Sequence, residues 1–239
     1  MTAHEIQKRL RQIANPETAK VAQHFFKTGP GQYGEGDIFL GIKVPMLREL
    51  AKEYKDIEFA EAEKLLHSEI HEERSFALML WLKLYSHKNA SAQKELIFHR
   101  YLANTDWINN WDLVDSTAPH IVGDFLFARD RKILYQLAKS GSLWERRISI
   151  IATQYFIRKN DFADTLKIAA LHLNDREDLM HKACGWMLRE VGERELKPLE
   201  EFLEKHFQKM PRTMLRYAIE KFPNAKRKFW LNRKEIDHG

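Results

Sequence analysis

The chain contains a single cysteine, Cys184, among its 239 residues. One cysteine cannot form an intramolecular disulfide or a thiolate metal cluster, so we expect Cys184 to be a small buried residue on a helix. No apolar run approaches the roughly 20 residues that a membrane-spanning helix needs. The first residues also lack the basic-then-apolar pattern of a secretory signal. We therefore expect a cytoplasmic protein with no membrane partner.

Glycine and proline are also scarce, at 10 and 7 residues. Apolar residues recur every three or four positions, as at Ile148, Ile151, Ala152 and Tyr155. This spacing is typical of helices that bury one face. No segment alternates apolar and polar residues for long enough to indicate a sheet. The sequence therefore predicts an all-α protein.

A repeat is visible along the chain, because a basic residue precedes an apolar helix at Arg74, Arg147, Lys182 and Arg212. The segment around Trp111 fills the gap between the first two. Steps of roughly 30 to 37 residues correspond to one helix pair each. Such pairs bury their apolar faces by stacking on each other. We expect one domain over residues 1–239, an α-solenoid with a concave basic groove.

Two segments depart from this repeat. Residues 28–37 hold four of the ten glycines, which predicts either an ordered loop or a mobile lid. Pro45 then suits the first turn of a helix through Arg48 and Leu50. At the other end, residues 226–239 begin with a basic run interleaved with aromatic residues, and we expect them to form a basic tail.

The stretch from Trp111 to Asp115 carries the strongest functional signal. In a helix these two side chains lie on one face, one turn apart. An aromatic ring and a carboxylate both attract a cation, so the pair suits a cationic ligand. We interpret Asp112 as a residue favoured by the helix N-terminus, and Asp37 and Asp106 as loop and cap residues.

The repeat predicts that several inner-helix residues line the same groove. A basic track with embedded aromatic rings is the expected surface for a nucleic-acid backbone, and the net charge of +5 agrees with it. The alternative is that each tryptophan belongs to the core and each arginine caps a neighbouring repeat. The predicted groove residues are Trp111, Asp115, Arg146, Arg147, Lys182, Trp186, Arg189 and Arg212.

Metal and cofactor chemistry is not indicated. His67 and His71 have the four-residue spacing of a helical metal pair, but no third ligand lies nearby in the sequence. We therefore expect two solvated histidines on one helix face. Neither a phosphate-binding loop nor a dinucleotide fingerprint is present, so we expect no metal and no cofactor.

Taken together, the motifs resemble those of the AlkD family of DNA alkylation repair enzymes, which are DNA glycosylases built from HEAT repeats. The resemblance covers nearly the whole chain. It rests on four segments of the sequence, namely residues 39–45 with Phe39 and Pro45, residues 111–124 from Trp111 to Asp124, residues 144–147 and residues 182–190.

This resemblance implies a monofunctional enzyme that removes cationic alkylated purines, such as N7-methylguanine and N3-methyladenine, from double-stranded DNA in base excision repair without flipping the base. By motif position, Asp115 matches the catalytic carboxylate and Trp111 and Trp186 match the aromatic pair on the damaged nucleotide. Arg147 matches a contact to the DNA backbone. We expect a monomer.

Two questions stay open at the sequence level. The family carries a tyrosine near the N-terminus, and Phe25, Phe26 and Tyr33 are all candidates to replace it. The alternative function is a HEAT-repeat protein that binds damaged or unusually shaped DNA without catalysis. The intact set of Trp111, Asp115 and Trp186 favours the enzyme.

Overall fold

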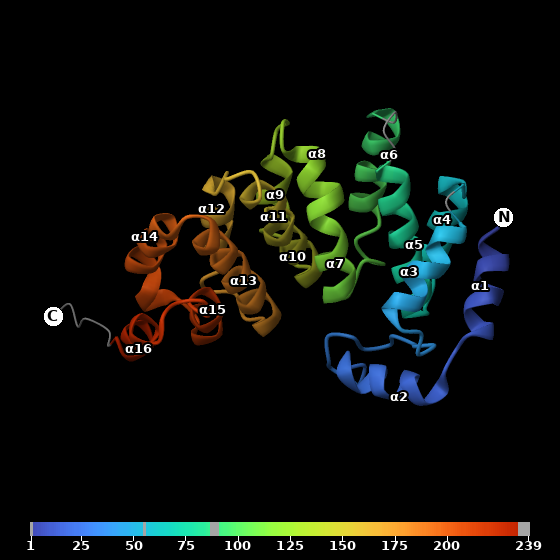
Figure 1. The fold of residues 1–239 in the computed structure, drawn as a ribbon, viewed down its shortest axis with the longest axis horizontal. Helices are drawn as coiled ribbons and strands as arrows, with labels where there is room; N and C mark the ends of the chain where they lie inside the picture. Colours follow the sequence, from blue (N-terminus) through green and yellow to red (C-terminus); the bar gives the residue numbers. More distant parts are fainter. Residues whose placement is uncertain (1, 55, 87–90, 234–239) are drawn as a thin grey trace. The chain divides into compact units, whose positions relative to one another are not determined.

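The computed structural model describes residues 2–54, 56–86 and 91–233, and these form an all-α fold of stacked helices (Figure 1). They contain no β-strand, and a single isolated bridge joins Ile38 to Ile70. The prediction of an all-α solenoid fold is confirmed. In the described part of the chain, no helix combines the length and apolar character needed to cross a membrane.

The chain divides into two compact units, residues 1–117 and residues 118–239. The first unit contains α1 (Ala3–Gln12), α2 (Pro16–Phe25), α3 (Val44–Glu53), α4 (Phe59–Leu66), α5 (His71–Tyr85), α6 (Ser91–Ala103) and nearly all of α7 (Trp111–Ala118).

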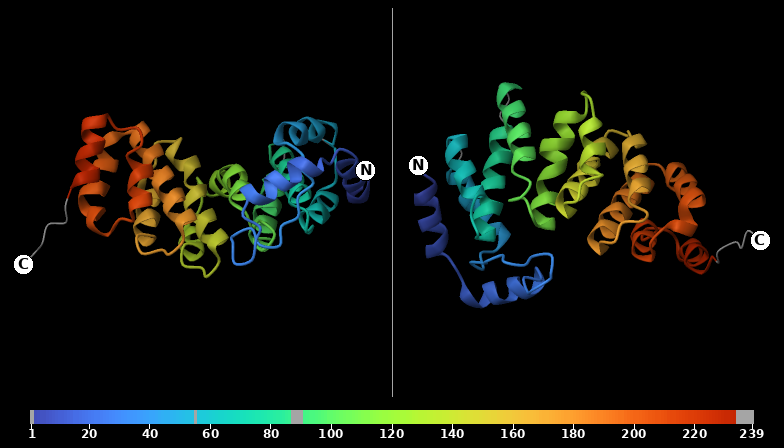
Figure 2. Two further views of the ribbon diagram at one scale, coloured as in Figure 1. Left: turned by 90° about the horizontal axis from the view of Figure 1, so that it is seen from below. Right: turned by 180° about the vertical axis from the view of Figure 1, so that it is seen from behind.

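The apolar spacing of the sequence explains the packing of the first unit. α5 packs against α3, α4 and α6 (Figures 1 and 2), and most of its apolar residues are buried, Phe76 and Trp81 completely. Pro45 lies in the first turn of α3, as predicted. α2 is different, since it has no buried residue, and Val21 and Phe25 on it are 69% and 61% exposed.

The second unit begins with a π-helical turn, η1 (Pro119–Gly123). It continues with α8 (Asp124–Leu126), α9 (Lys132–Leu137), α10 (Leu143–Ala152), α11 (Gln154–Ile157), α12 (Ala163–Leu171), α13 (Asp178–Arg194), α14 (Leu196–His206), the 3-10 turn η2 (Phe207–Lys209), α15 (Arg212–Ala218) and α16 (Asn224–Asn232).

Inner helices of the second unit pack on their neighbours in chain order. α13 contacts α10 on one side and α15 on the other. Gly185 of α13 makes the second contact possible, because a Cβ atom there would lie 2.5 Å from the Met214 carbonyl oxygen of α15. Cys184 beside it is fully buried, as expected.

Two sequence predictions of local structure are corrected. His67 and His71 do not share a helix face, because α4 ends at Leu66 and α5 begins at His71. Residues 226–232 of the predicted tail instead belong to α16, on which Trp230 is buried. Residues 234–239 lie outside the described part of the chain.

Candidate nucleic-acid site

The start of α7 is held by a buried asparagine. The Asn110 side-chain oxygen accepts the backbone N–H of Trp111 at 2.9 Å, and its amide nitrogen donates to Asp37 Oδ2 at 3.1 Å. Trp111 and Asp115 follow on this helix, one turn apart, and both are half-buried. Because Asn110 is fully buried, it fixes the helix end that carries the predicted catalytic pair.

Three aromatic residues of the N-terminal region surround Trp111. The Phe26 ring stacks on the indole with a centroid distance of 5.4 Å, and Phe25 meets it edge-on at 6.0 Å. The Trp111 indole N–H donates to the Tyr33 hydroxyl at 3.3 Å. All three candidates for the family's N-terminal tyrosine therefore contact Trp111, and Phe25 is the most exposed of them.

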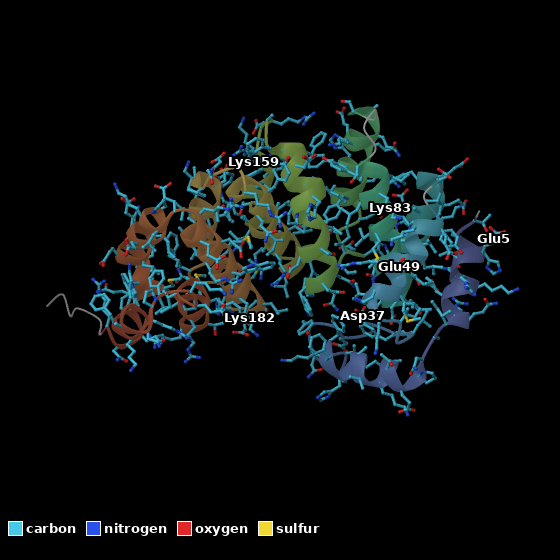
Figure 3. The ribbon with its side chains drawn as sticks, in the orientation of Figure 1. Glu5, Asp37, Glu49, Lys83, Lys159 and Lys182 are labelled. Carbon is cyan, nitrogen blue, oxygen red and sulfur yellow. The ribbon has the colours of Figure 1, made fainter. Side chains whose placement is uncertain are left out.

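The glycine-rich segment that carries Tyr33 is an ordered loop. Backbone hydrogen bonds close it from Gln32 to Gly29, from Gly34 to Lys27 and from Asp37 to Gly34. Asp37 lies at its end (Figure 3) and is buried. These hydrogen bonds favour the ordered loop over the mobile lid, the two alternatives that the sequence leaves open.

His71 is buried between two carboxylates, which corrects the prediction of a solvated histidine. Its Nδ1 lies 3.1 Å from Asp37 Oδ2, and its Nε2 lies 2.8 Å from Asp112 Oδ2. Arg74 donates to the second Asp37 oxygen at 2.6 Å. Burial alone lowers the pKa of His71, but the charge of Asp112 and hydrogen bonds to both carboxylates outweigh burial and raise that pKa to about 9.

The pKa of the Asp37 carboxyl is shifted downward, opposite to that of His71. Burial alone raises its pKa, but the hydrogen bond from His71 and the charge of Arg74 lower it below the usual range. Asp37 is therefore a loop residue, as predicted, and its carboxylate is in addition a buried ion-pair partner. Asp112 does lie in the first turn of α7, as predicted.

A second buried carboxylate organises the loop that leads to α3. Glu72 accepts the backbone N–H groups of Leu40, Gly41 and Ile42 at 2.9, 2.7 and 3.2 Å. Gly41 has a φ of +77° and lies so close to α2 that a Cβ atom would be 2.2 Å from the Asn15 carbonyl oxygen. A glycine is required at this position.

In the second unit, the arginine pair of α10 binds neighbouring helix ends. The guanidinium of Arg146 forms an ion pair with Asp175 at 2.8 Å and donates to the carbonyl oxygens of Ser140 and Gly141. Arg147 is only 4% exposed and donates to the Leu179 carbonyl oxygen at 2.5 Å. Both side chains therefore link α10 to the segment around the start of α13.

The remaining predicted residues of this unit also have intramolecular partners. Lys182, on α13 (Figure 3), pairs with Asp178 at 2.8 Å, and Arg212 donates to the Leu231 carbonyl oxygen at 3.0 Å. Arg189 pairs with Glu220. The half-buried Trp186 donates its indole N–H to Glu190 at 2.9 Å.

Comparison with known proteins decides the family. The model of the DNA alkylation repair enzyme family matches residues 6–222. The chain belongs to this family. A solved structure described as a predicted DNA alkylation repair enzyme from Enterococcus faecalis has the same fold, with a TM-score of 0.68 at 18% identity, covering 88% of this chain and 97% of that one. No curated protein matches the chain.

Membership of the DNA alkylation repair enzyme family gives the chain a role in DNA repair, with DNA as its substrate. Within this family assignment, the structure brings Trp111 together with Phe25, Phe26 and Tyr33 in the first unit. The groove that we expect residues of both units to line remains a prediction, as does the DNA-binding role of the five cationic residues.

The sequence analysis did not predict the buried polar residues around the candidate site. The signal was present at residues 71–74, where four consecutive charged or titratable residues precede the apolar run of α5. The side chains of all four residues are buried. A run of this kind at a helix start indicates structural carboxylates that hold neighbouring loops.

Proposed function

We propose that the protein is a monofunctional DNA glycosylase that hydrolyses the N-glycosidic bond of cationic alkylated purines in DNA. The observation that carries the proposal is the pairing of Trp111 and Asp115, one turn apart on a helix whose start is anchored by Asn110. An aromatic face and a carboxylate on one rigid turn suit a positively charged transition state.

The chemistry needs few groups. Alkylation at N7 or N3 makes the purine a cationic leaving group, so the bond breaks with its electron pair going to the base, which becomes neutral. The sugar is left as an oxocarbenium ion, which Asp115 stabilises. Asp115 also orients the water whose oxygen attacks C1′ and accepts its proton, as a carboxylate does in glycoside hydrolysis.

We assign supporting roles to the other predicted residues. Trp111 and Trp186 contact the sugar and backbone of the damaged nucleotide, and Arg146, Arg147, Lys182, Arg189 and Arg212 contact phosphates. A lesion bound in this way reacts without entering a pocket, in contrast to glycosylases that flip the base.

The test is single-turnover release of N7-methylguanine from a defined duplex by the wild type and by Asp115→Asn. Loss of transition-state stabilisation predicts a rate lower by about 10²- to 10³-fold, with the dissociation constant for the duplex nearly unchanged. The exposed Asp106 provides the matched control, and Asp106→Asn should retain the wild-type rate.

Two outcomes would contradict the proposal. An Asp115→Asn protein that excises at the wild-type rate would exclude the carboxylate. No release by the wild type, together with tight salt-sensitive binding, would instead favour a protein that recognises damaged DNA without catalysis.

A further inference from the structure

The surroundings of His71 form an electrically balanced buried cluster. In the described part of the chain, the charged groups that face its ring are Asp37 from the loop after α2, Asp112 from α7 and Arg74 from its own helix. Asp37 and Asp112 carry two negative charges, and Arg74 supplies one positive charge. A proton on His71 brings the cluster to neutrality, which is the form that burial favours.

Hydrogen-bond counting leads to the same protonation state. Both ring nitrogens of His71 face carboxylate oxygens, at 3.1 and 2.8 Å. A neutral imidazole has one N–H and would turn a lone pair toward one of these oxygens, whereas an imidazolium donates to both. The geometry therefore fits a doubly protonated ring at neutral pH.

His71 also touches the aromatic cluster around Trp111. Its ring stacks on Phe39 at 4.6 Å and lies 5.0 Å from Phe26, which itself stacks on Trp111. Asp112, its ion-pair partner, is the residue directly after Trp111. His71 thus contacts both the helix that carries Trp111 and a ring packed against the indole.

We propose that His71 is a positioning residue, whose imidazolium joins the glycine-rich loop to the first turn of α7 and thereby holds Trp111 in its orientation for the damaged nucleotide. The part of this inference that concerns excision rests on the proposed function. The part that concerns the orientation of Trp111 stands independently of it.

The sign of the pH dependence follows from the elevated pKa of His71. An ordinary histidine titrates near 6.5, and in the folded protein this group titrates at about 9. The stabilising contribution of the imidazolium is therefore fully present below pH 6.5 and is lost as the pH rises through 9. The orientation of Trp111 should change over the same upper range.

The first experiment follows Trp111 directly. The protein is labelled with 5-fluorotryptophan, and the Trp111 resonance is identified by its disappearance in Trp111→Phe. The titration uses the Tyr33→Phe protein, so that the phenol bonded to the indole cannot contribute. We expect the Trp111 resonance to shift as the pH passes through about 9. A resonance that stays constant from pH 7 to pH 10 would overturn the proposal.

The second experiment separates positioning from stability. For His71→Gln at pH 7, we expect the Trp111 resonance to shift and the single-turnover excision rate to fall by about 10- to 100-fold. The dissociation constant for undamaged duplex should change less than about threefold. The matched control is His67→Gln, because His67 is exposed and lies outside the cluster. It should behave as the wild type does.

The outcomes distinguish this inference from the proposed function. A folded His71→Gln protein with the wild-type rate and an unmoved Trp111 resonance would refute the positioning role. If the wild type itself releases no alkylated base, the proposed function fails, while the fluorine titration still decides whether His71 positions Trp111. The titration also covers the case in which His71→Gln does not fold, since it needs no substitution at His71.

Discussion

Glu72 is a buried residue that binds several backbone groups beside the candidate site. Its carboxylate accepts three consecutive N–H groups of the segment that leads to α3. A hydrogen bond to a buried charged group contributes about 1.5 to 3 kcal/mol, so this one side chain holds residues 40–42 in place against α5.

We predict that Glu72→Gln lowers the free energy of unfolding by about 2 to 4 kcal/mol, because the amide keeps one acceptor oxygen and adds a buried NH₂ group without a partner. Urea denaturation followed by circular dichroism measures the change. Glu69→Gln is the control, because the Glu69 side chain is exposed and accepts none of these three N–H groups. It should alter stability by less than about 0.5 kcal/mol. Equal stability of Glu72→Gln and the wild type would contradict this role.

The sequence predicts Trp111 and Asp115 because both lie on one helix turn, where spacing alone sets their common face. The supporting contacts are of another kind. Asp37 and His71 are 34 residues apart, and His71 and Asp112 are 41 residues apart. No local pattern pairs such residues, so the sequence predicts a solvated His71 where the structure has a buried one.

At the level of helices, close packing restricts which side chain Gly185 of the second unit could carry. A Cβ atom on Gly185 would lie 2.5 Å from both the Met214 carbonyl oxygen and the Tyr217 Cβ atom. One is a backbone atom of α15 and the other is the first side-chain atom, so neither can rotate away. Removing the clash therefore requires a shift of the whole helix. Gly141, by contrast, has no atom within 4 Å of the corresponding position.

We therefore predict that Gly185→Ala destabilises the protein by about 1 to 3 kcal/mol, although alanine favours helix by about 1 kcal/mol relative to glycine. Gly141→Ala is the matched control and should leave the melting temperature nearly unchanged. Thermal unfolding by calorimetry compares the two. A Gly185→Ala protein as stable as its control would show that α13 and α15 separate at little cost.

Helix content could be predicted because apolar spacing is a local signal. Where a helix ends depends also on which side chains the rest of the fold buries, and the sequence does not show this. The tail prediction failed at residues 226–232 because basic side chains there lie beside one buried ring, that of Trp230. One anchoring aromatic residue is enough to dock a helix whose composition resembles that of an exposed tail.

For the molecule as a whole, the distribution of positive charge leads to a measurable expectation. If the five predicted cations contact phosphates, the logarithm of the DNA association constant should fall with the logarithm of salt concentration with a slope of about −4.5, or −0.9 per contact. Fluorescence anisotropy on a labelled duplex measures it. Lys182→Gln should reduce the slope by about 1, and Lys52→Gln on the first unit should not. A flat response would argue against duplex binding.

Gly123 and Gly185 share a spacing that bears on how such a chain changes length over evolution. A Cβ atom added at either glycine would meet the carbonyl oxygen of the residue 29 positions later. That residue is Ala152 for Gly123 (152 − 123) and Met214 for Gly185 (214 − 185). An insertion between the two partners leaves this contact intact when it lies in a turn that joins helices, such as residues 128–131 or 207–211. Length variation among descendants of this gene should therefore collect at those turns and spare the helices that carry the glycines.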